Sequence, residues 1–161
     1  MNPLNQLHKI LIAVEDSDYS TIATSYGFDL AKSLGAEVAL LHVNDIPTGT
    51  PYVGDPILNE APAMIPEIIA AQEETGKKLL NKIADTYGSN LTIYTFNKIG
   101  NPIDEILITA EEWNADMIIL GTHGRTGIDH FISGSVAEKV IRKADCPVLI
   151  IPNKTKKGKG E

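Results

Sequence analysis

The feature that most constrains the fold of this chain is the regular alternation of short apolar runs with longer amphipathic stretches. The runs are rich in Ile, Leu and Val, which predicts strands buried on both faces of a sheet. The stretches between them repeat apolar residues at helical spacing. The predicted order is strand 9–14, helix 18–34, strand 37–43, helix 65–87, strand 91–96, helix 102–113, strand 116–120, helix 135–143 and strand 147–151.

Strands that alternate with helices indicate an α/β fold, because parallel strands need crossovers and helical crossovers cover both faces of the sheet. Right-handed connections predict an open, doubly wound sheet of five parallel strands in the order 3-2-1-4-5. In such sheets ligands bind beyond the carboxyl ends of the strands, at the switch point between the first and fourth strands. We expect one domain over residues 1–153 and a disordered basic tail over 154–161.

Composition and charge exclude several classes of protein. No apolar stretch reaches the ~20 residues that a membrane span needs, and the N-terminal apolar run is too short for a signal peptide. Cys146 is the single cysteine, which suits a reducing, cytoplasmic location. Residues 1–153 hold 10 cationic and 20 acidic residues, a net charge of −10 that disfavours binding to nucleic acid.

The segment 121–140, GTHGRTGIDHFISGSVAEKV, combines two glycine clusters with the start of a helix. Gly121 and Gly124 follow the fourth strand, and Gly134 and Ser135 precede the last helix, in the spacing G-x2-G-x9-G-[ST]. A connector would explain the glycines through flexibility alone. Their position at the carboxyl end of a strand favours a ligand site instead.

Backbone amides supply the chemistry of this segment. Ser135 starts a capping-box pattern and is the predicted N-cap of the last helix, whose first N–H groups, including that of Val136, lack partners within the helix. A phosphate can accept hydrogen bonds from them, and Gly134 leaves room for its approach. Arg125 adds a charge for a terminal phosphate. The alternative is a tight turn with an ordinary helix cap and no ligand.

Glu15 and Asp16 end the first strand, across the switch point from the glycines. There they are placed to meet an adenine, a ribose or a metal; the alternative is a solvated turn in which Asp16 or Asp18 caps the next helix. The pair also resembles the acids of a response-regulator receiver. A receiver needs an aspartate at the end of the third strand, where this chain has Asn97.

No catalytic or metal-binding residues are predicted. His123 and His130 share a loop but have no partner at metal-ligand spacing. His42, at the end of the second strand, reads as a packed or hydrogen-bonded residue and not as a base. A nucleophile elbow, a P-loop and a dinucleotide fingerprint are absent. The proline-rich segment 44–66 is either a lid or a variable surface loop.

From Lys9 to Pro152 the sequence resembles the universal stress protein family, in its ATP-binding branch. The resemblance rests on ILIAVEDS, LLHV, GNPIDEILITAEEWNADMIILGTHGRTG and ISGSVAEKVIRKADCPVLIIP, which include the family's G-x2-G-x9-G-[ST] signature. It implies an adenine-nucleotide-binding domain that dimerises and acts in stress signalling. The family usually has aspartate in place of Glu15 and often glycine in place of Asp16.

The resemblance also implies a set of binding residues. Val43 would meet the adenine edge through its backbone while Ala13 packs on the ring; Gly121 and Gly124 would border the ribose and phosphates. The residues expected around the nucleotide are Ala13, Val14, Glu15, Val43, Leu120, Gly121, Gly124, Arg125, Gly134, Ser135 and Val136. Dimers are expected to form through the last strand, at Val148, Leu149, Ile150 and Ile151.

The function expected from the sequence is a dimeric, nucleotide-dependent switch for a regulatory protein partner. Its ligand would be ATP, or ADP or AMP, with Mg²⁺ held mainly by the phosphates. Two alternatives remain open. One is slow ATP hydrolysis or self-phosphorylation with Ser133 or Ser135 as acceptor, and the other is an interaction protein that needs no nucleotide.

Overall fold

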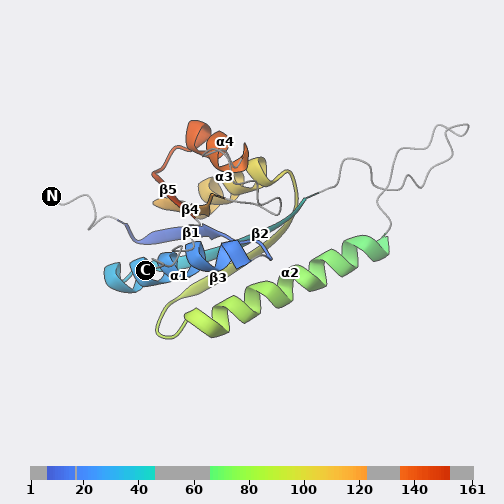
Figure 1. Cartoon of the computed structure of the whole chain (residues 1–161), viewed down its shortest axis with the longest axis horizontal. Helices are drawn as coiled ribbons and strands as arrows, with labels where there is room; N and C mark the ends of the chain where they lie inside the picture. The colour runs from blue at the N-terminus through green and yellow to red at the C-terminus, as the bar shows by residue number, and fades with distance from the viewer. Residues whose placement is uncertain (1–6, 17, 46–65, 123–134, 153–161) are drawn as a thin grey trace, which may run out of the picture.

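The computed structural model describes residues 7–16, 18–45, 66–122 and 135–152. Within these ranges the chain forms a parallel five-stranded sheet of order β3-β2-β1-β4-β5, flanked by helices (Figure 1). The elements are β1 (Lys9–Ala13), α1 (Asp18–Leu34), β2 (Glu37–Asp45), α2 (Pro66–Tyr87), β3 (Ile93–Gly100), α3 (Pro102–Trp113), β4 (Met117–Gly121), α4 (Ser135–Lys143) and β5 (Val148–Ile151). The predicted α/β class and strand order are confirmed.

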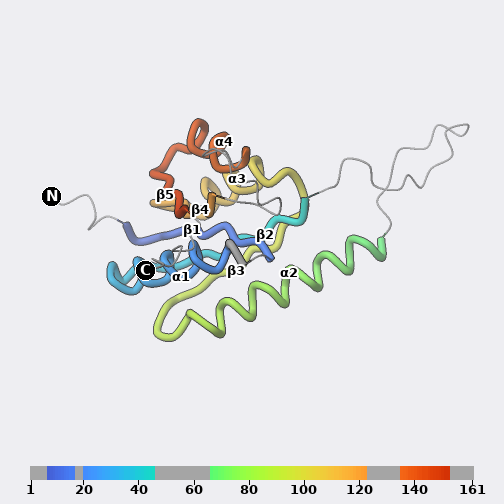
Figure 2. The backbone as a smooth tube through the Cα atoms, in the orientation of Figure 1, coloured from blue at the N-terminus to red at the C-terminus, as the bar shows by residue number. Residues whose placement is uncertain are grey.

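Helices cover both faces of the sheet (Figure 2). α1 and α2 pack on one face, where Ile10 and Ile12 of β1 meet Phe28 of α1. α3 and α4 pack on the other, where Leu11 joins Ile106 of α3. No helix in the described ranges is long and apolar enough to cross a membrane.

Each predicted element is present, and the largest difference is in β3. The prediction ended this strand at residue 96, before the polar pair Asn97-Lys98, and that end is wrong. β3 pairs with β2 as far as Asp45↔Gly100. The strand accommodates Asn97 because its side-chain amide is hydrogen-bonded on both sides, by Asn44 and by α2.

Asp116 joins the amino ends of β1 and β4. Its carboxylate oxygen Oδ2 accepts hydrogen bonds from the backbone N–H groups of His8, at 2.8 Å, and Lys9, at 2.9 Å. Its own N–H donates to the Lys9 carbonyl at 2.8 Å. Nearby, the Lys9 ammonium lies 5.2 Å from the centre of the Trp113 ring. These contacts fix the amino edge of the sheet, opposite the edge where ligands are expected.

Removal of the α3 cap should destabilise the fold. The Asn101 side chain accepts hydrogen bonds from the N–H groups of Ile103, at 3.0 Å, and Asp104, at 3.3 Å. We expect Asn101→Ala to lower the free energy of unfolding by about 1 kcal/mol, measured by urea denaturation. Asn101→Ser is the matched control, since serine also caps. Equal midpoints for the two variants would contradict the prediction.

Cys146 should react slowly with thiol reagents. Burial against the α3–α4 face raises the pKa of its thiol, and the charges of Asp116 and Asp145 raise the pKa further, against a lowering by a backbone hydrogen bond. At a given mildly alkaline pH the folded chain therefore holds less thiolate than an exposed cysteine would. We expect labelling by a chromogenic disulfide reagent to be slower in the native protein than in urea, and to keep rising at pH values where the unfolded chain has levelled off. Identical pH profiles in both states would refute this.

Candidate functional site

The carboxyl ends of β1, β2 and β4 lie side by side, because β1 pairs with β2 on one side and with β4 on the other. The chain leaves β1 towards α1 on one face and leaves β4 towards α4 on the other face. The two connections therefore diverge, and at such a switch point parallel α/β sheets form the crevice that they use for ligands. Ala13, Val43 and Gly121, three of the predicted residues, lie on the strands that border this crevice.

Val43 directs its backbone polar groups into the crevice. The last β1–β2 pair joins Ala13 with Leu41, whose carbonyl accepts a hydrogen bond of 2.8 Å from the Val14 N–H. Backbone groups alternate in direction along a strand, so Val43, two residues after Leu41, also turns its N–H and C=O to the β1 side. β1 ends at Ala13. One donor and one acceptor thus face the space beyond its end.

His42 holds the chain where β1 leaves the sheet. Its Nδ1 lies 3.0 Å from the carbonyl oxygen of Val14. A carbonyl can only accept, so Nδ1 carries the hydrogen. Both residues are buried, with 3% of His42 and 2% of Val14 exposed. The interpretation of His42 as a hydrogen-bonded residue is confirmed.

Glu15 begins the turn into α1 and borders a pocket between α1 and α2. Its N–H donates to Ser20 Oγ at 3.0 Å. The pocket has a volume of about 220 Å³, and Glu15, Asp16, Thr24 and Thr86 contribute to its lining. The hydroxyls of Thr24 and Thr86 donate to carbonyls of their own helices, at 2.7 and 2.6 Å.

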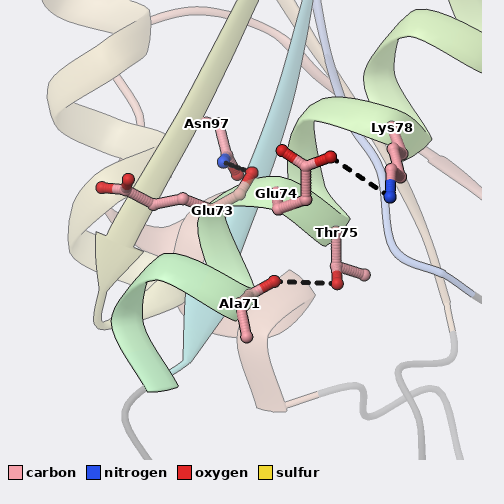
Figure 3. Close-up of polar contacts among 6 residues, drawn as sticks. All are labelled: Ala71, Glu73, Glu74, Thr75, Lys78 and Asn97. Carbon is pink, nitrogen blue, oxygen red and sulfur yellow. Dashed lines mark hydrogen bonds and ion pairs between the residues drawn. The ribbon is translucent and has the colours of Figure 1, made fainter. Parts of the chain in front are cut away.

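A polar chain that sequence reasoning missed joins β2, β3 and α2. Asn44 Nδ2 donates to Asn97 Oδ1 at 2.9 Å and to the Lys98 carbonyl at 3.2 Å. Asn97 Nδ2 donates in turn to the Glu73 carbonyl in α2, at 3.0 Å (Figure 3). Gly76 makes this approach possible, because a Cβ there would lie 2.2 Å from Asn97 Oδ1. The signal in the sequence was the pair of polar residues, His42 and Asn44, on alternate positions after the apolar run 38–41 of the same strand.

The end of β4 and the start of α4 supply the other side of the crevice. Leu120 is 4% exposed and packs on the α3–α4 face, and Gly121 is the last residue of β4. Because β4 and β5 are parallel, the helix between them runs from the carboxyl edge of the sheet to the amino edge, and α4 therefore starts at the carboxyl edge. Ser135, its exposed first residue, and Val136, which is half-buried, therefore begin the helix on this side.

Several predicted residues lie outside the part of the chain that the structure describes. Gly124, Arg125 and Gly134 lie outside the described residues, as do His123, His130 and Ser133. Most of the segment 44–66 also lies outside them. Across the described ranges, no group of three or more His, Cys, Asp or Glu side chains is arranged to hold a metal ion.

β5 is one edge of the sheet. It pairs with β4 through Ile118↔Val148 to Gly121↔Ile151, and its order in the sheet places no strand of the described chain on its other side. Leu149 and Ile150 are half-buried. An apolar edge of this kind offers backbone groups to a further strand.

Comparison with known sequences identifies the family. The model of the universal stress protein family matches residues 6–152. Universal stress protein MJ0531 of Methanocaldococcus jannaschii is 36% identical over 150 residues, which cover 93% of this chain and 85% of the relative. Universal stress protein YxiE of Bacillus subtilis is 33% identical over 148 residues, which cover 89% of this chain and 98% of the relative.

Solved structures share the fold. The protein MJ0577 of M. jannaschii has a TM-score of 0.74 at 27% identity, with 92% of this chain and 97% of that chain covered. A universal stress protein in complex with cAMP has a TM-score of 0.64 at 19% identity, with coverages of 92% and 98%. The Archaeoglobus fulgidus universal stress protein in complex with dAMP has a TM-score of 0.59 at 24% identity, with coverages of 89% and 97%. This chain belongs to the universal stress protein family.

Proposed function

We propose that this chain is a cytoplasmic, adenine-nucleotide-binding regulatory protein of the stress response, which acts as a dimeric switch. The ligand is ATP, ADP or AMP, bound in the crevice between the carboxyl ends of β1 and β4. Mg²⁺ is held mainly by the phosphates. Nucleotide occupancy would change the surface offered to a regulatory protein partner.

The observation that carries this proposal is the direction of the Val43 backbone. Its N–H and C=O face the crevice beyond the end of β1. Adenine presents a matching pair on its Watson–Crick edge, the N1 acceptor and the N6 amino donor. Guanine presents the reversed order, an N1–H donor and an O6 acceptor. The Val43 N–H would then face another donor, and its C=O would face another acceptor. The backbone at this position therefore favours adenine.

The start of α4 supports a phosphate site on the other side of the crevice. N–H groups that have no partner within the helix and the positive end of the helix dipole meet there, at Ser135 and Val136. Gly121, the last residue of β4, has no side chain that would obstruct a ligand there. In the proposal, Gly124 and Gly134 let the ribose and phosphates approach, and Arg125 contacts the terminal phosphate. Glu15 keeps the negative charge of the family's usual aspartate on a longer stem.

Two relatives of the same fold were solved with adenine nucleotides, one with cAMP and one with dAMP. These complexes agree with an adenine ligand. The proposed dimer joins the β5 edges of two chains through Val148, Leu149, Ile150 and Ile151, which would cover the apolar edge.

A second activity is favoured by one observation, the exposed hydroxyl of Ser135 at the first position of α4. Beside a bound triphosphate this hydroxyl is a candidate phosphate acceptor. Mass spectrometry of the chain after incubation with Mg-ATP tests it. An unmodified chain together with no release of phosphate would leave binding as the function.

Adenine nucleotides should stabilise the native state, and guanine nucleotides should do so far less. A ligand at ~100 times its Kd adds about 2.7 kcal/mol to the free energy of unfolding. We expect millimolar Mg-ATP to raise Tm clearly in a thermal-unfolding series with ATP, ADP, AMP, cyclic AMP and GTP. The proposal fails if none of the adenine nucleotides shifts Tm. An equal shift by GTP would contradict the proposed selection of adenine by the Val43 backbone.

Val136 allows the phosphate side to be tested through one amide. Proline is tolerated in the first turn of a helix but has no N–H, so Val136→Pro removes a phosphate donor and leaves the helix start intact. We expect ATP to bind about tenfold more weakly, measured by isothermal titration. Val136→Ala keeps the N–H and is the control for the lost side chain. Equal losses in the two variants would mean that the amide does not bind phosphate.

A further inference from the structure

Two buried polar side chains lie immediately before and after Val43 in β2. His42 is 3% exposed and Asn44 is 6% exposed. Their neighbours on the same side of the strand, Val38 and Leu40, belong to the apolar cluster under α1 and α2. Side chains alternate between the faces of a sheet, so His42 and Asn44 share this face while the Val43 side chain packs on the α3–α4 face. The polar pair thus flanks Val43, whose backbone faces the crevice.

His42 and Asn44 hold the neighbouring strands on opposite sides of β2. His42 Nδ1 donates to the Val14 carbonyl, at 3.0 Å, where the β1 ladder has ended. Asn44 Nδ2 donates to the Lys98 carbonyl of β3, at 3.2 Å. One contact replaces a lost strand pairing, and the other reinforces an existing one. Together they hold the segments on both sides of Val43.

The contact on the β3 side extends into α2. Asn97 accepts from Asn44 at 2.9 Å and donates to the Glu73 carbonyl at 3.0 Å, so a single chain of hydrogen bonds runs from β2 to the helix. Figure 3 shows the Asn97 amide directed at the Glu73 backbone. The Asn97 amide occupies the space in which a side chain at position 76 would lie, so glycine is required there. The end of β2 is therefore tied to a helix as well as to both neighbouring strands.

From these contacts we propose that His42 and Asn44 are positioning residues for adenine recognition: they fix the direction of the Val43 N–H and C=O without touching the ligand. An apolar pair would fill the same volume and avoid the cost of burying polar groups, which is repaid only when every group is hydrogen-bonded. What the polar pair adds is a fixed placement of the backbone between β1 and β3. The proposal rests on the proposed function of the crevice.

Leucine at position 42 or 44 tests the proposal, because it removes the hydrogen bonds and replaces the polar side chain with an apolar one of similar size. His42→Asn is the conservative variant, since a carboxamide nitrogen takes nearly the position of Nδ1 and can still donate to Val14. Asp116→Ala is the matched control. It also removes side-chain bonds to the β1 backbone, but at the opposite, amino edge of the sheet. Direct titration with ATP and with GTP, well below the unfolding midpoint of each variant, gives both affinities.

We expect His42→Leu and Asn44→Leu each to weaken ATP binding about tenfold and to lower the ratio of ATP affinity to GTP affinity. His42→Asn should keep most of the ATP affinity and most of the ATP-to-GTP affinity ratio. Asp116→Ala should lower Tm and leave both the ATP affinity and the ratio unchanged. Should a leucine variant fail to fold, Asn97→Ala breaks the next contact outward, and a smaller loss of the same ratio is expected.

Three results would overturn the positioning role. The first is a wild-type affinity ratio in the leucine variants, or in Asn97→Ala where that variant is used. The second is an equal fall in ATP and GTP affinity, which indicates general destabilisation. The third is a loss of ATP affinity in Asp116→Ala as large as in the leucine variants. Failure of the wild-type chain to bind any adenine nucleotide is a separate result, which would refute the function of the crevice itself.

Discussion

The burial of β1 is the constraint on which the rest of the structure depends. This strand is paired on both edges and covered on both faces, and Ile10, Leu11 and Ile12 are completely inaccessible to solvent. Because β1 is enclosed on all sides, the chain that follows Ala13 leaves the sheet at its carboxyl edge. The gap that it leaves beside β2 exposes the Val43 backbone, so the candidate site is a direct result of how the core is built.

The proposed ligand would connect two distant parts of the sequence. The base side is formed by the ends of β1 and β2, and the phosphate side by the end of β4 and the start of α4. Within the sheet these parts are joined by the short ladder between β1 and β4, from Ile10↔Met117 to Ile12↔Ile119. That ladder stops before the crevice begins. A nucleotide bound across the crevice would thus supply the link that the backbone does not.

Periodicity was enough to predict the fold, because buried parallel strands and their covering helices leave strong patterns in a sequence. The end of β3 was misjudged since Asn97 is polar, and a local pattern cannot reveal that its amide is paired with Asn44 and with α2. Topology and the glycine spacing pointed to Gly121, whereas Ala13 and Val43 were expected from the family resemblance; the structure places all three on strands that end at one edge of the sheet. The contacts of His42 and Asn44 were not predictable, because they depend on side-chain geometry across three strands.

The amino edge of the sheet has a consequence for spectroscopy. Trp113 is the single tryptophan of the chain, and its ring lies near the Lys9 ammonium and at 5.7 Å from the ring of Tyr94. A strand of five residues spans about 16 Å, so the indole sits one strand length from the crevice and no ligand bound there can contact it. Its emission therefore reports whether the amino edge is intact. Quenching on addition of a nucleotide would signal a change transmitted through the sheet, and not contact with the base.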